Sequence, residues 1–195
     1  MKLSDDLPAR PSVQQLEAEL QRLDRKREVR RSIFSAVGVL IVVAAAVVLV
    51  INLWIPVLQV RRGSMAPTLR DGDVIAFITT GSINHGDIIA FHHGNQTLIK
   101  RVVAVSGDWV DLNRDGTVML NGQPLDEPYI SEYSIGECTI ELPLQVPDKQ
   151  FFVMGDHRLT SLDSRSLEIG LIHQDQVIGK DLLRIWPFDK IGFVK

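Results

Sequence analysis

The longest apolar run of the chain covers residues 33–53 and contains no charged residue. About 20 apolar residues, at a rise of ~1.5 Å per residue, form a helix that crosses the ~30 Å hydrocarbon core of a bilayer. A buried core helix rarely stays apolar on every face over such a length. A cleaved secretory signal has a shorter apolar region, of about 7 to 15 residues. The pattern therefore predicts a transmembrane signal-anchor helix over residues 32–55.

A shorter helix is predicted ahead of this run. Four apolar residues recur at spacings of three, four and three, namely Val13, Leu16, Leu20 and Leu23. This spacing gives a helix with one apolar stripe, and Pro11 and Ser12 fit its start. The stripe covers about two heptads, whereas a coiled coil sustains three or four. Residues 1–31 are therefore predicted to form a cytoplasmic segment with a short amphipathic helix, with self-association as the alternative.

After residue 55, the helical period gives way to short runs rich in β-branched and aromatic residues. These runs predict strands at residues 74–78, 88–91, 97–105, 109–112, 117–120 and 151–154. Gly-Asp pairs that begin at Gly72, Gly86, Gly107 and Gly155 flank the runs and are interpreted as turns. Asp115-Gly116 and Asn121-Gly122 are hairpin signals. We predict a mainly β domain over residues 56–195, built from antiparallel sheets in a sandwich or barrel-like arrangement.

The charges around the apolar run are uneven. Six Lys or Arg residues lie within positions 22–31, against two, Arg61 and Arg62, in the fifteen residues after Trp54. Such residues favour the cytoplasmic end of a membrane helix. We therefore predict a single-pass cell-membrane protein with a cytoplasmic N-terminus and an extracytoplasmic domain. The net charge of −3 does not indicate a nucleic-acid partner. The lipid bilayer is the predicted partner of the apolar run.

The first candidate catalytic residue is Ser64, a possible nucleophile in the stretch "RRGSMAPTL". A serine hydroxyl is a weak nucleophile until a base within about 2.6 to 3.2 Å removes its proton. Neither a G-x-S-x-G nor an S-x-x-K motif surrounds Ser64. Pro67 biases Ala66 away from helix, which predicts an extended or turning segment. The base must therefore come from elsewhere in the chain, as a histidine or a lysine.

Lys100, in "LIKRVVAV", is a candidate base. Strand alternation places it on one face with Leu98 and Val102 and turns Arg101 outward to the other face. Burial among apolar residues lowers a lysine pKa from about 10.4 toward neutrality, because the ammonium loses its hydration. A lysine in a strand is, however, commonly a solvated edge residue. The strand pattern alone leaves both interpretations open.

A third cluster lies in "MGDHRLTSLDSR", within residues 154–165. It combines charges of both signs with short hydroxyl side chains: Asp156, Arg158, Ser161, Asp163, Ser164 and Arg165. This composition suits a hydrogen-bonded loop that braces a site. The alternative is a polar surface loop whose ion pairs contribute little.

Four stretches, "GSMAPTL", "HGDIIAF", "LIKRVVAVSGD" and "MGDHRLTSLDSR", follow the apolar run in this order. Together they resemble the motif set of bacterial type I signal peptidases. The 46 residues between Asp108 and Gly155 resemble the compact form of that family. The resemblance implies a largely antiparallel β domain lying against the outer leaflet. It also implies hydrolysis of signal peptides from exported preproteins, without a metal or another cofactor.

Residue by residue, the resemblance implies that Ser64 is the nucleophile and Lys100 the general base. Ser161 matches the hydroxyl that orients the lysine, while Asp163 and Arg165 match a supporting ion pair. The resemblance also implies a shallow substrate pocket for small side chains near Met65, Leu69 and Ile99.

The sequence departs from the family pattern in three places. His157 replaces a usual asparagine, and "AVSGD" replaces the more usual "GLPGD". Arg62 stands two residues before the nucleophile, where many members have serine, threonine or glycine. In some members that hydroxyl helps to bind the oxyanion, so the Ser64 N–H is expected to carry more of this task. The second oxyanion donor is left unassigned.

Two other functions are compatible with parts of the sequence. A metal-dependent hydrolase would draw its ligands from the histidines, His85, His92, His93, His157 and His173. Adjacent histidines in a strand point to opposite faces, which disfavours a shared ion. A membrane-anchored binding protein could also keep the fold without activity. The single cysteine, Cys138, excludes an intrachain disulfide and is predicted as a half-buried strand residue. The oligomeric state and the identity of the preproteins are not set by the sequence.

Overall fold

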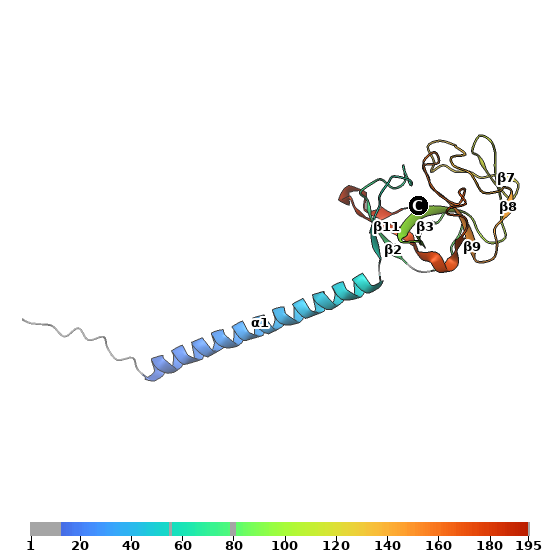
Figure 1. Ribbon diagram of the computed structural model, residues 1–195. Helices are drawn as coiled ribbons and strands as arrows, with labels where there is room; N and C mark the ends of the chain where they lie inside the picture. Colours follow the sequence, from blue (N-terminus) through green and yellow to red (C-terminus); the bar gives the residue numbers. More distant parts are fainter. Residues whose placement is uncertain (1–12, 55, 79–80, 195) are drawn as a thin grey trace, which may run out of the picture. The chain divides into compact units, whose positions relative to one another are not determined.

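The computed structural model describes residues 13–54, 56–78 and 81–194 (Figure 1). The chain divides into two compact units, Met1–Leu53 and Trp54–Lys195, and each is described by itself. Its elements are α1 (Val13–Trp54), β1 (Val57–Gln59), β2 (Val74–Ile78), β3 (Ile88–His93), β4 (Gln96–Ala104), β5 (Trp109–Leu112), β6 (Val118–Leu120), β7 (Gln123–Pro124), β8 (Leu144–Gln145), β9 (Gln150–Met154), β10 (Ile172–His173), the 3-10 turn η1 (Gln174–Gln176), β11 (Val177–Trp186), the 3-10 turn η2 (Phe188–Lys190) and β12 (Gly192–Phe193).

Helix α1 is continuous and joins the two helices that the sequence pattern separates. It contains no proline, and its one glycine, Gly38, lies inside the apolar part, so nothing interrupts the backbone near residue 32. The predicted start signals, Pro11 and Ser12, lie outside the described residues. The stretch Arg25–Leu49 is about 37 Å long at ~1.5 Å per residue. In the described part of the chain, α1 is the one helix long and apolar enough to cross a bilayer.

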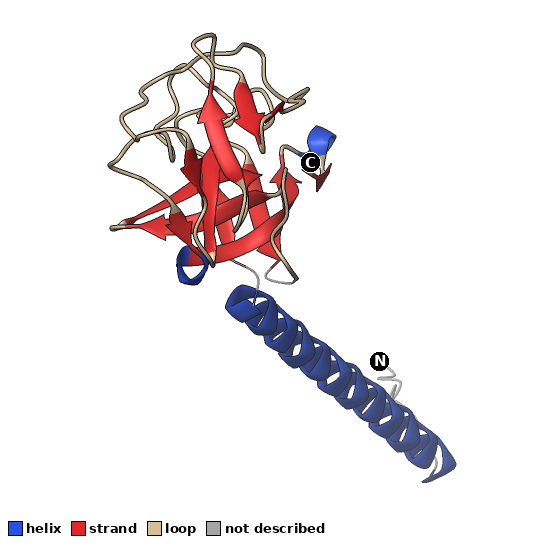
Figure 2. Cartoon of the chain, turned by 90° about the vertical axis from the view of Figure 1, so that its right-hand side faces the viewer, coloured by secondary structure: helices blue, strands red, loops and turns tan. Residues whose placement is uncertain are grey.

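The second unit is mainly β, as predicted, and every strand pairing among its described residues is antiparallel. The larger sheet has the order β1-β2-β11-β3-β4-β9-β10, and β12 pairs with β11. Figure 2 shows its long strands crossing at steep angles, so that this sheet curls. The smaller sheet has the order β7-β6-β5-β8. The predicted hairpin signals fall at its turns, where Asn121 and Gly122 have φ of 52° and 78°.

The central strands of the larger sheet are covered on both faces. In β3, Ile88 and Ala90 belong to one apolar cluster, whereas Ile89 and Phe91 belong to another on the opposite face. A third cluster joins β4 and β9 to the smaller sheet. Polar side chains on either face of these strands are consequently removed from water. This arrangement sets the environment of Lys100.

The predicted strands are confirmed within a residue or two at their ends, but the longest strand is absent from the prediction. Strand β11 lies between β2 and β3. Its register shifts between Val177 and Gly179 and again between Lys180 and Leu182. Bulges of this kind break the two-residue alternation that reveals a strand in sequence. The interior glycine weakens the signal further.

The prediction that Cys138 lies in a strand is wrong, although the residue is half-buried as expected. Residues 125–143 form a loop without strands. The backbone next to Cys138 finds other partners, since Thr139 N and Ile140 N both donate to the Arg165 carbonyl at 2.8 and 3.0 Å. These hydrogen bonds tie the loop to the segment that follows β9.

Candidate active site

Ser64 lies in a loop, residues 60–73, that closes on itself between β1 and β2. Val60 N donates to the Asp73 carbonyl at 2.8 Å, and Gly72 N donates to the Val60 carbonyl at 3.0 Å. The two ends of the loop are therefore held together as if in a short sheet. The serine is half-buried on a turn, as the proline three residues later predicts.

Two apolar side chains of this loop anchor it in the core of the domain. Met65 and Leu69 are 1% and 0% exposed and belong to the same core cluster. On the other side of the serine, Arg62 and Gly63 have left-handed φ angles of 71° and 50°. A left-handed pair turns the chain sharply, so it lifts Ser64 out of the line of β1. The position of Ser64 is thus fixed by the buried side chains that follow it and by the tight turn that precedes it.

Lys100 reaches Ser64 from β4. Its side chain is 2% exposed, and Nζ donates to Ser64 Oγ at 2.8 Å. Burial lowers the pKa of Lys100 to about 8, against the opposing effect of the Asp163 carboxylate. The Arg165 guanidinium lowers this pKa further, and Asp156 raises it. The interpretation of Lys100 as a solvated edge residue is therefore wrong.

The segment after β9 packs directly against the serine. His157 N donates to the Ser64 carbonyl at 3.1 Å. A Cβ on Gly155 would collide with Ser161 Oγ and would lie 2.5 Å from the Ser64 carbonyl oxygen. Gly155 is therefore required for close approach. Ser161 is 4% exposed, and its hydroxyl has no hydrogen-bond partner among the described residues, so its orienting role stays a prediction.

Asp163 and Arg165 form an ion pair that is fully buried. Arg165 Nε donates to Asp163 Oδ1 at 2.8 Å, and Nη2 donates to Oδ2 at 2.9 Å. Asp163 Oδ2 also accepts from Gly155 N at 2.9 Å. The other donors of the guanidinium reach the carbonyl oxygens of Ser134, Ile135, Arg158 and Ser161. The pair joins three loop segments, which excludes the interpretation of this region as a surface loop with weak ion pairs.

Arg101 is a correction to the sequence analysis, because it is buried rather than turned outward. It is 3% exposed and holds Asp156 with two hydrogen bonds of 2.9 and 2.8 Å. Asp156 also accepts from Thr68 Oγ1, and the Arg101 guanidinium lies 3.9 Å from the centre of the Tyr129 ring. Strand alternation is correct, but the second face of β4 is covered by loops. Asp156 thereby links the serine loop to the segment after β9.

A further buried pair joins Arg158 to Glu127, and the sequence analysis singled out the arginine alone. Arg158 donates to both carboxylate oxygens of Glu127, and Tyr129 OH donates to the same carboxylate at 2.9 Å. Burial and the Glu127 charge raise the pKa of Tyr129 above its ordinary value. The partners are 31 residues apart, and "DEPYI" has the composition of an ordinary loop. Only "MGDHR" pointed to half of this pair.

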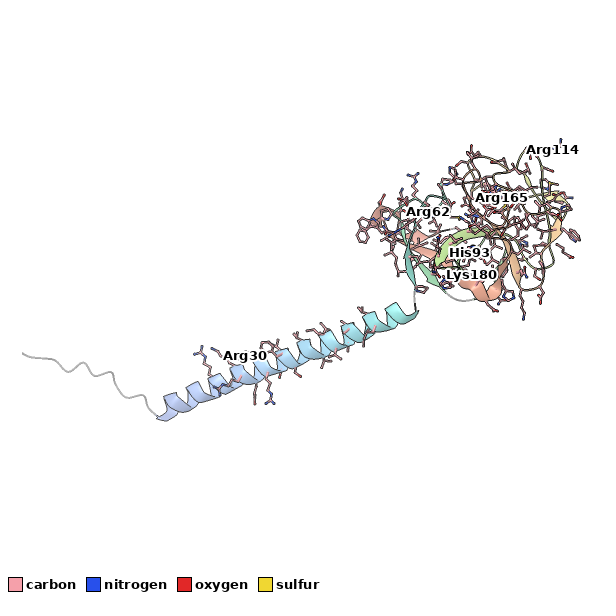
Figure 3. All side chains as sticks on the ribbon, in the orientation of Figure 1. Arg30, Arg62, His93, Arg114, Arg165 and Lys180 are labelled. Atoms are coloured by element: carbon pink, nitrogen blue, oxygen red, sulfur yellow. The ribbon has the colours of Figure 1, made fainter. Side chains whose placement is uncertain are left out.

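A groove opens on both sides of the Ser64–Lys100 pair. One lobe, here called the apolar lobe, has a volume of about 340 Å³ and is lined by Leu58, Val60, Met65, Ile99 and neighbouring residues of β1 and β4. The second, called the polar lobe, has about 390 Å³ and extends over residues 93–96, Thr160 and Glu168. Figure 3 shows Arg62 and His93, which both line the polar lobe. Of the three predicted pocket residues, Met65 and Ile99 line the apolar lobe, whereas Leu69 lies in the core behind it.

Three of the five histidines take separate side-chain partners in the structure. His85 Nε2 lies 2.6 Å from Asp108, His157 Nδ1 lies 2.9 Å from Thr160 Oγ1, and His173 Nδ1 lies 3.3 Å from Asp175. Among the described residues, no group of three or more His, Cys, Asp or Glu is placed to hold a metal ion.

Comparison with known proteins adds an independent observation. The model of the signal peptidase family, peptidase S26, matches residues 31–186. Signal peptidase I U of Bacillus subtilis strain 168 is 34% identical over 180 residues, which cover 85% of this chain and 95% of the relative. Signal peptidase IB of Staphylococcus aureus strain MRSA252 is 34% identical over 154 residues, covering 69% of this chain and 79% of the relative. A solved signal peptidase I from Enterococcus faecalis V583 is 29% identical, with a TM-score of 0.43, over 52% of this chain and 98% of that chain.

The family match covers most of the chain and includes the whole groove with Ser64 and Lys100. The similarity to the Bacillus subtilis relative covers 95% of that relative's length. This chain therefore belongs to the signal peptidase family of serine peptidases, peptidase S26.

Proposed function

We propose that this chain is a membrane-anchored endopeptidase that removes N-terminal signal peptides from exported preproteins, with Ser64 as nucleophile and Lys100 as general base. The observation that carries the proposal is the distance of 2.8 Å between Lys100 Nζ and Ser64 Oγ at a buried position. A pKa of about 8 leaves an appreciable fraction of the lysine neutral near pH 7. The neutral amine accepts the hydroxyl proton over this distance.

In the proposed reaction, Ser64 Oγ attacks the carbonyl carbon of the scissile bond while Lys100 Nζ takes its proton. The ammonium then gives this proton to the departing amine, the C–N bond breaks, and an ester to Ser64 forms. A water molecule attacks the ester carbonyl and gives a proton to Lys100. The C–O bond to Ser64 breaks, and the proton returns to the serine. Ser-Lys pairs are a known variant of triad chemistry.

The Ser64 N–H is the proposed donor to the negatively charged oxygen of the tetrahedral intermediate. In the described part of the chain, this N–H donates to no protein acceptor, and it belongs to the attacking residue itself. Donors aimed at a developing charge stabilise it most when they are fixed in advance. The turn at Arg62 and Gly63 and the core position of Met65 hold the serine backbone in this way. The second donor stays unassigned.

Ser161, Asp163 and Arg165 are proposed as supporting residues. The buried Asp163 carboxylate holds Gly155 N, and Gly155 contacts the Ser64 backbone. Ser161 lies against the same glycine with an unpartnered hydroxyl, which makes it available to Lys100 when the amine changes its protonation state. Together, these residues fix the lysine and the serine relative to each other.

The proposed substrate binds as an extended peptide in the groove. Strand β1 pairs only with β2 in the described sheet, and the Gln96–Lys100 part of β4 has a partner only in β3. These two unpaired edges line the apolar lobe. A peptide lying between them would add main-chain hydrogen bonds, as in other cases of strand addition. Met65 and Ile99 narrow the lobe, which favours small side chains before the cleaved bond.

Anchoring and orientation complete the proposal. Helix α1 contains an apolar stretch that is long enough to cross a bilayer, preceded by basic residues that favour a cytoplasmic N-terminus. The folded domain also exposes a group of large apolar side chains near its C-terminal end, Trp186, Phe188, Ile191 and Phe193. Such side chains suit the boundary of a lipid leaflet. An anchored enzyme is concentrated at the plane where an export signal emerges from the bilayer.

The proposal is tested by incubating the purified full chain with a preprotein and comparing Ser64→Ala and Lys100→Met with the parent chain. We expect each variant to lose about 1,000-fold or more in kcat/KM, since both groups act on the reacting atoms. Ser106→Ala and Lys149→Met are matched controls at exposed positions and should retain activity. Cleavage by the Ser64 variant at the parent rate would exclude the mechanism. No cleavage by the parent chain would support a binding protein without activity.

A further inference from the structure

Two guanidinium groups flank the groove beside the proposed nucleophile. Arg61 and Arg62 both line the apolar lobe and the polar lobe, and both are exposed. Within the described part of the chain, neither side chain has an ion-pair partner within 4.0 Å. Asp71, the acidic residue beside them, accepts a hydrogen bond of 3.0 Å from the Arg62 backbone N–H instead. Two positive charges therefore remain available at the mouth of the groove.

The other charged groups of the groove do not cancel this charge. The polar lobe contains one carboxylate, Glu168, and one histidine, His93, in addition to the two arginines. Lys100 also lines both lobes, and it is positive whenever it is not the neutral base. The groove is consequently positive where it passes Ser64. Water-exposed charges of this kind act on a ligand by complementarity and contribute modestly to binding.

The two lobes differ in the side chains that they accept. The apolar lobe is walled by residues such as Leu58, Val60 and Met65, where a charged side chain would lose its hydration. The polar lobe also has apolar residues in its walls, but His93, Asn95 and Glu168 line this lobe and not the apolar lobe, so a charged side chain meets polar groups there. On the proposed function, residues before the cleaved bond occupy the apolar lobe and those after it occupy the polar lobe. An extended peptide advances about 3.3 Å per residue, so its first two positions after the bond lie within reach of an arginine side chain near Ser64.

We infer that Arg61 and Arg62 make this peptidase select preproteins with an aspartate or glutamate within the first two positions after the cleaved bond, and discriminate against lysine and arginine there. The inference rests on the proposed function and adds a substrate preference to it. Because both guanidinium groups are hydrated, the preference is moderate and sensitive to salt.

The test uses the full chain and three peptides that share Ala-x-Ala before the cleaved bond and differ only at the second position after it, as Glu, Gln or Lys. For the parent chain, we expect kcat/KM for the Glu peptide to exceed that for the Lys peptide by about 3- to 10-fold at low salt, and less at high salt. In Arg61→Gln/Arg62→Gln, this ratio should fall toward 1. Arg61→Lys/Arg62→Lys keeps both charges and should keep the preference.

Arg114→Gln is the matched control, because Arg114 lies at the far edge of the domain from Arg62 in Figure 3. Its ratio should equal that of the parent chain. Equal kcat/KM for the Glu and Lys peptides in the parent chain, with the Gln peptide still cleaved, would overturn the inference and leave the proposed function intact. A ratio that survives in the double glutamine variant would overturn it as well. Failure of the parent chain to cleave any of the three peptides would overturn the proposed function and this inference together.

Discussion

Lys100 is held in a position where opposing effects act on its protonation, and loss of hydration is the largest of them. Loss of hydration favours the neutral amine, while the carboxylates of Asp163 and Asp156 favour the ammonium. Arg165 neutralises part of this attraction through its ion pair with Asp163. A buried lysine without charged neighbours would be neutral, but its amine would be a weaker base. A catalytic base works best with a pKa near the working pH. Burial, together with these charges, thus places the pKa of Lys100 at about 8, within reach of neutral pH.

The pH dependence of cleavage follows from this value. Since the neutral amine is the proposed base, kcat/KM should rise about tenfold per pH unit below about 8 and level off above it. Initial rates with a short peptide, measured from about pH 6 to about pH 10, give the profile. Lys149→Met removes an exposed lysine and should leave the rising limb in place. A rise in kcat/KM that is complete by about pH 6.5, as for a histidine base, would contradict the assignment of Lys100 as the base.

The same lysine should lower the stability of the fold at neutral pH. Its pKa is about 8 in the folded chain against 10.5 for an ordinary lysine, so the unfolded chain binds more protons between these values. The free energy of unfolding therefore rises with pH from about 8 to about 10.5 and is reduced below that window. Lys100→Met should raise it by about 1 to 3 kcal/mol at pH 7, with a smaller gain near pH 10. Urea unfolding at the two pH values measures the difference, and a variant that is less stable at pH 7 would refute this account.

At the scale of elements, the site depends on how closely two loops pack. The serine loop, residues 60–73, and the segment after β9 meet where Gly155 contacts the Ser64 backbone. Asp156 and Arg101 fasten the same two loops from the other side. Strand β4 carries both Lys100 and Arg101, so one strand supplies the proposed base and the arginine that binds Asp156. Precise placement of the serine is therefore a property of the packing between these elements.

Gly155→Ala tests this packing. The added Cβ would collide with Ser161 and with the Ser64 carbonyl oxygen, so the two loops must separate. We expect kcat/KM to fall by about 100-fold, because a displacement of about 1 Å is costly to catalysis, and stability to fall by about 1 to 3 kcal/mol. Gly155→Ala/Ser161→Gly removes only one collision and should recover part of the stability. Gly38→Ala, in α1, where no atom outside the helix's own backbone lies within 4 Å of the added Cβ, provides a control for the chemical change alone. Parent-like activity of Gly155→Ala would show that the loops need no close contact.

At the scale of the whole molecule, the proposed function requires the N-terminal end of α1 and the β domain to lie on opposite sides of the membrane. This is tested in a Cys138→Ser chain that carries a single new cysteine, either Glu28→Cys or Arg114→Cys. In right-side-out membrane vesicles, an impermeant maleimide should label Arg114→Cys at once and Glu28→Cys only after permeabilisation. The expectation follows from the basic residues before the apolar run. The reverse pattern of labelling would invert the proposed orientation.

Several features of this protein were determined by the sequence alone. The uncharged run of residues 33–53 predicts a long helix, because in an apolar medium a single segment satisfies its own backbone hydrogen bonds only as a helix. The short runs rich in β-branched and aromatic residues at 74–78 and 109–112 similarly predict the extent of β2 and β5. The ordered motifs singled out Ser64 and Lys100. These are local properties, carried by residues that are neighbours in the chain.

Only the tertiary structure decided which of these local features meet. Ser64 and Lys100 are 36 residues apart, and the bond of 2.8 Å between them depends on loops that close over both faces of β4. The same closure buries Arg101, which alternation alone turned toward water. It also brings Glu127 to Arg158 and inserts the irregular strand β11 into the middle of the sheet. A periodic sequence pattern predicts which face of a strand a residue occupies. Whether other segments cover that face depends on parts of the chain that are distant in sequence. This covering determines the burial of the side chain and therefore its pKa.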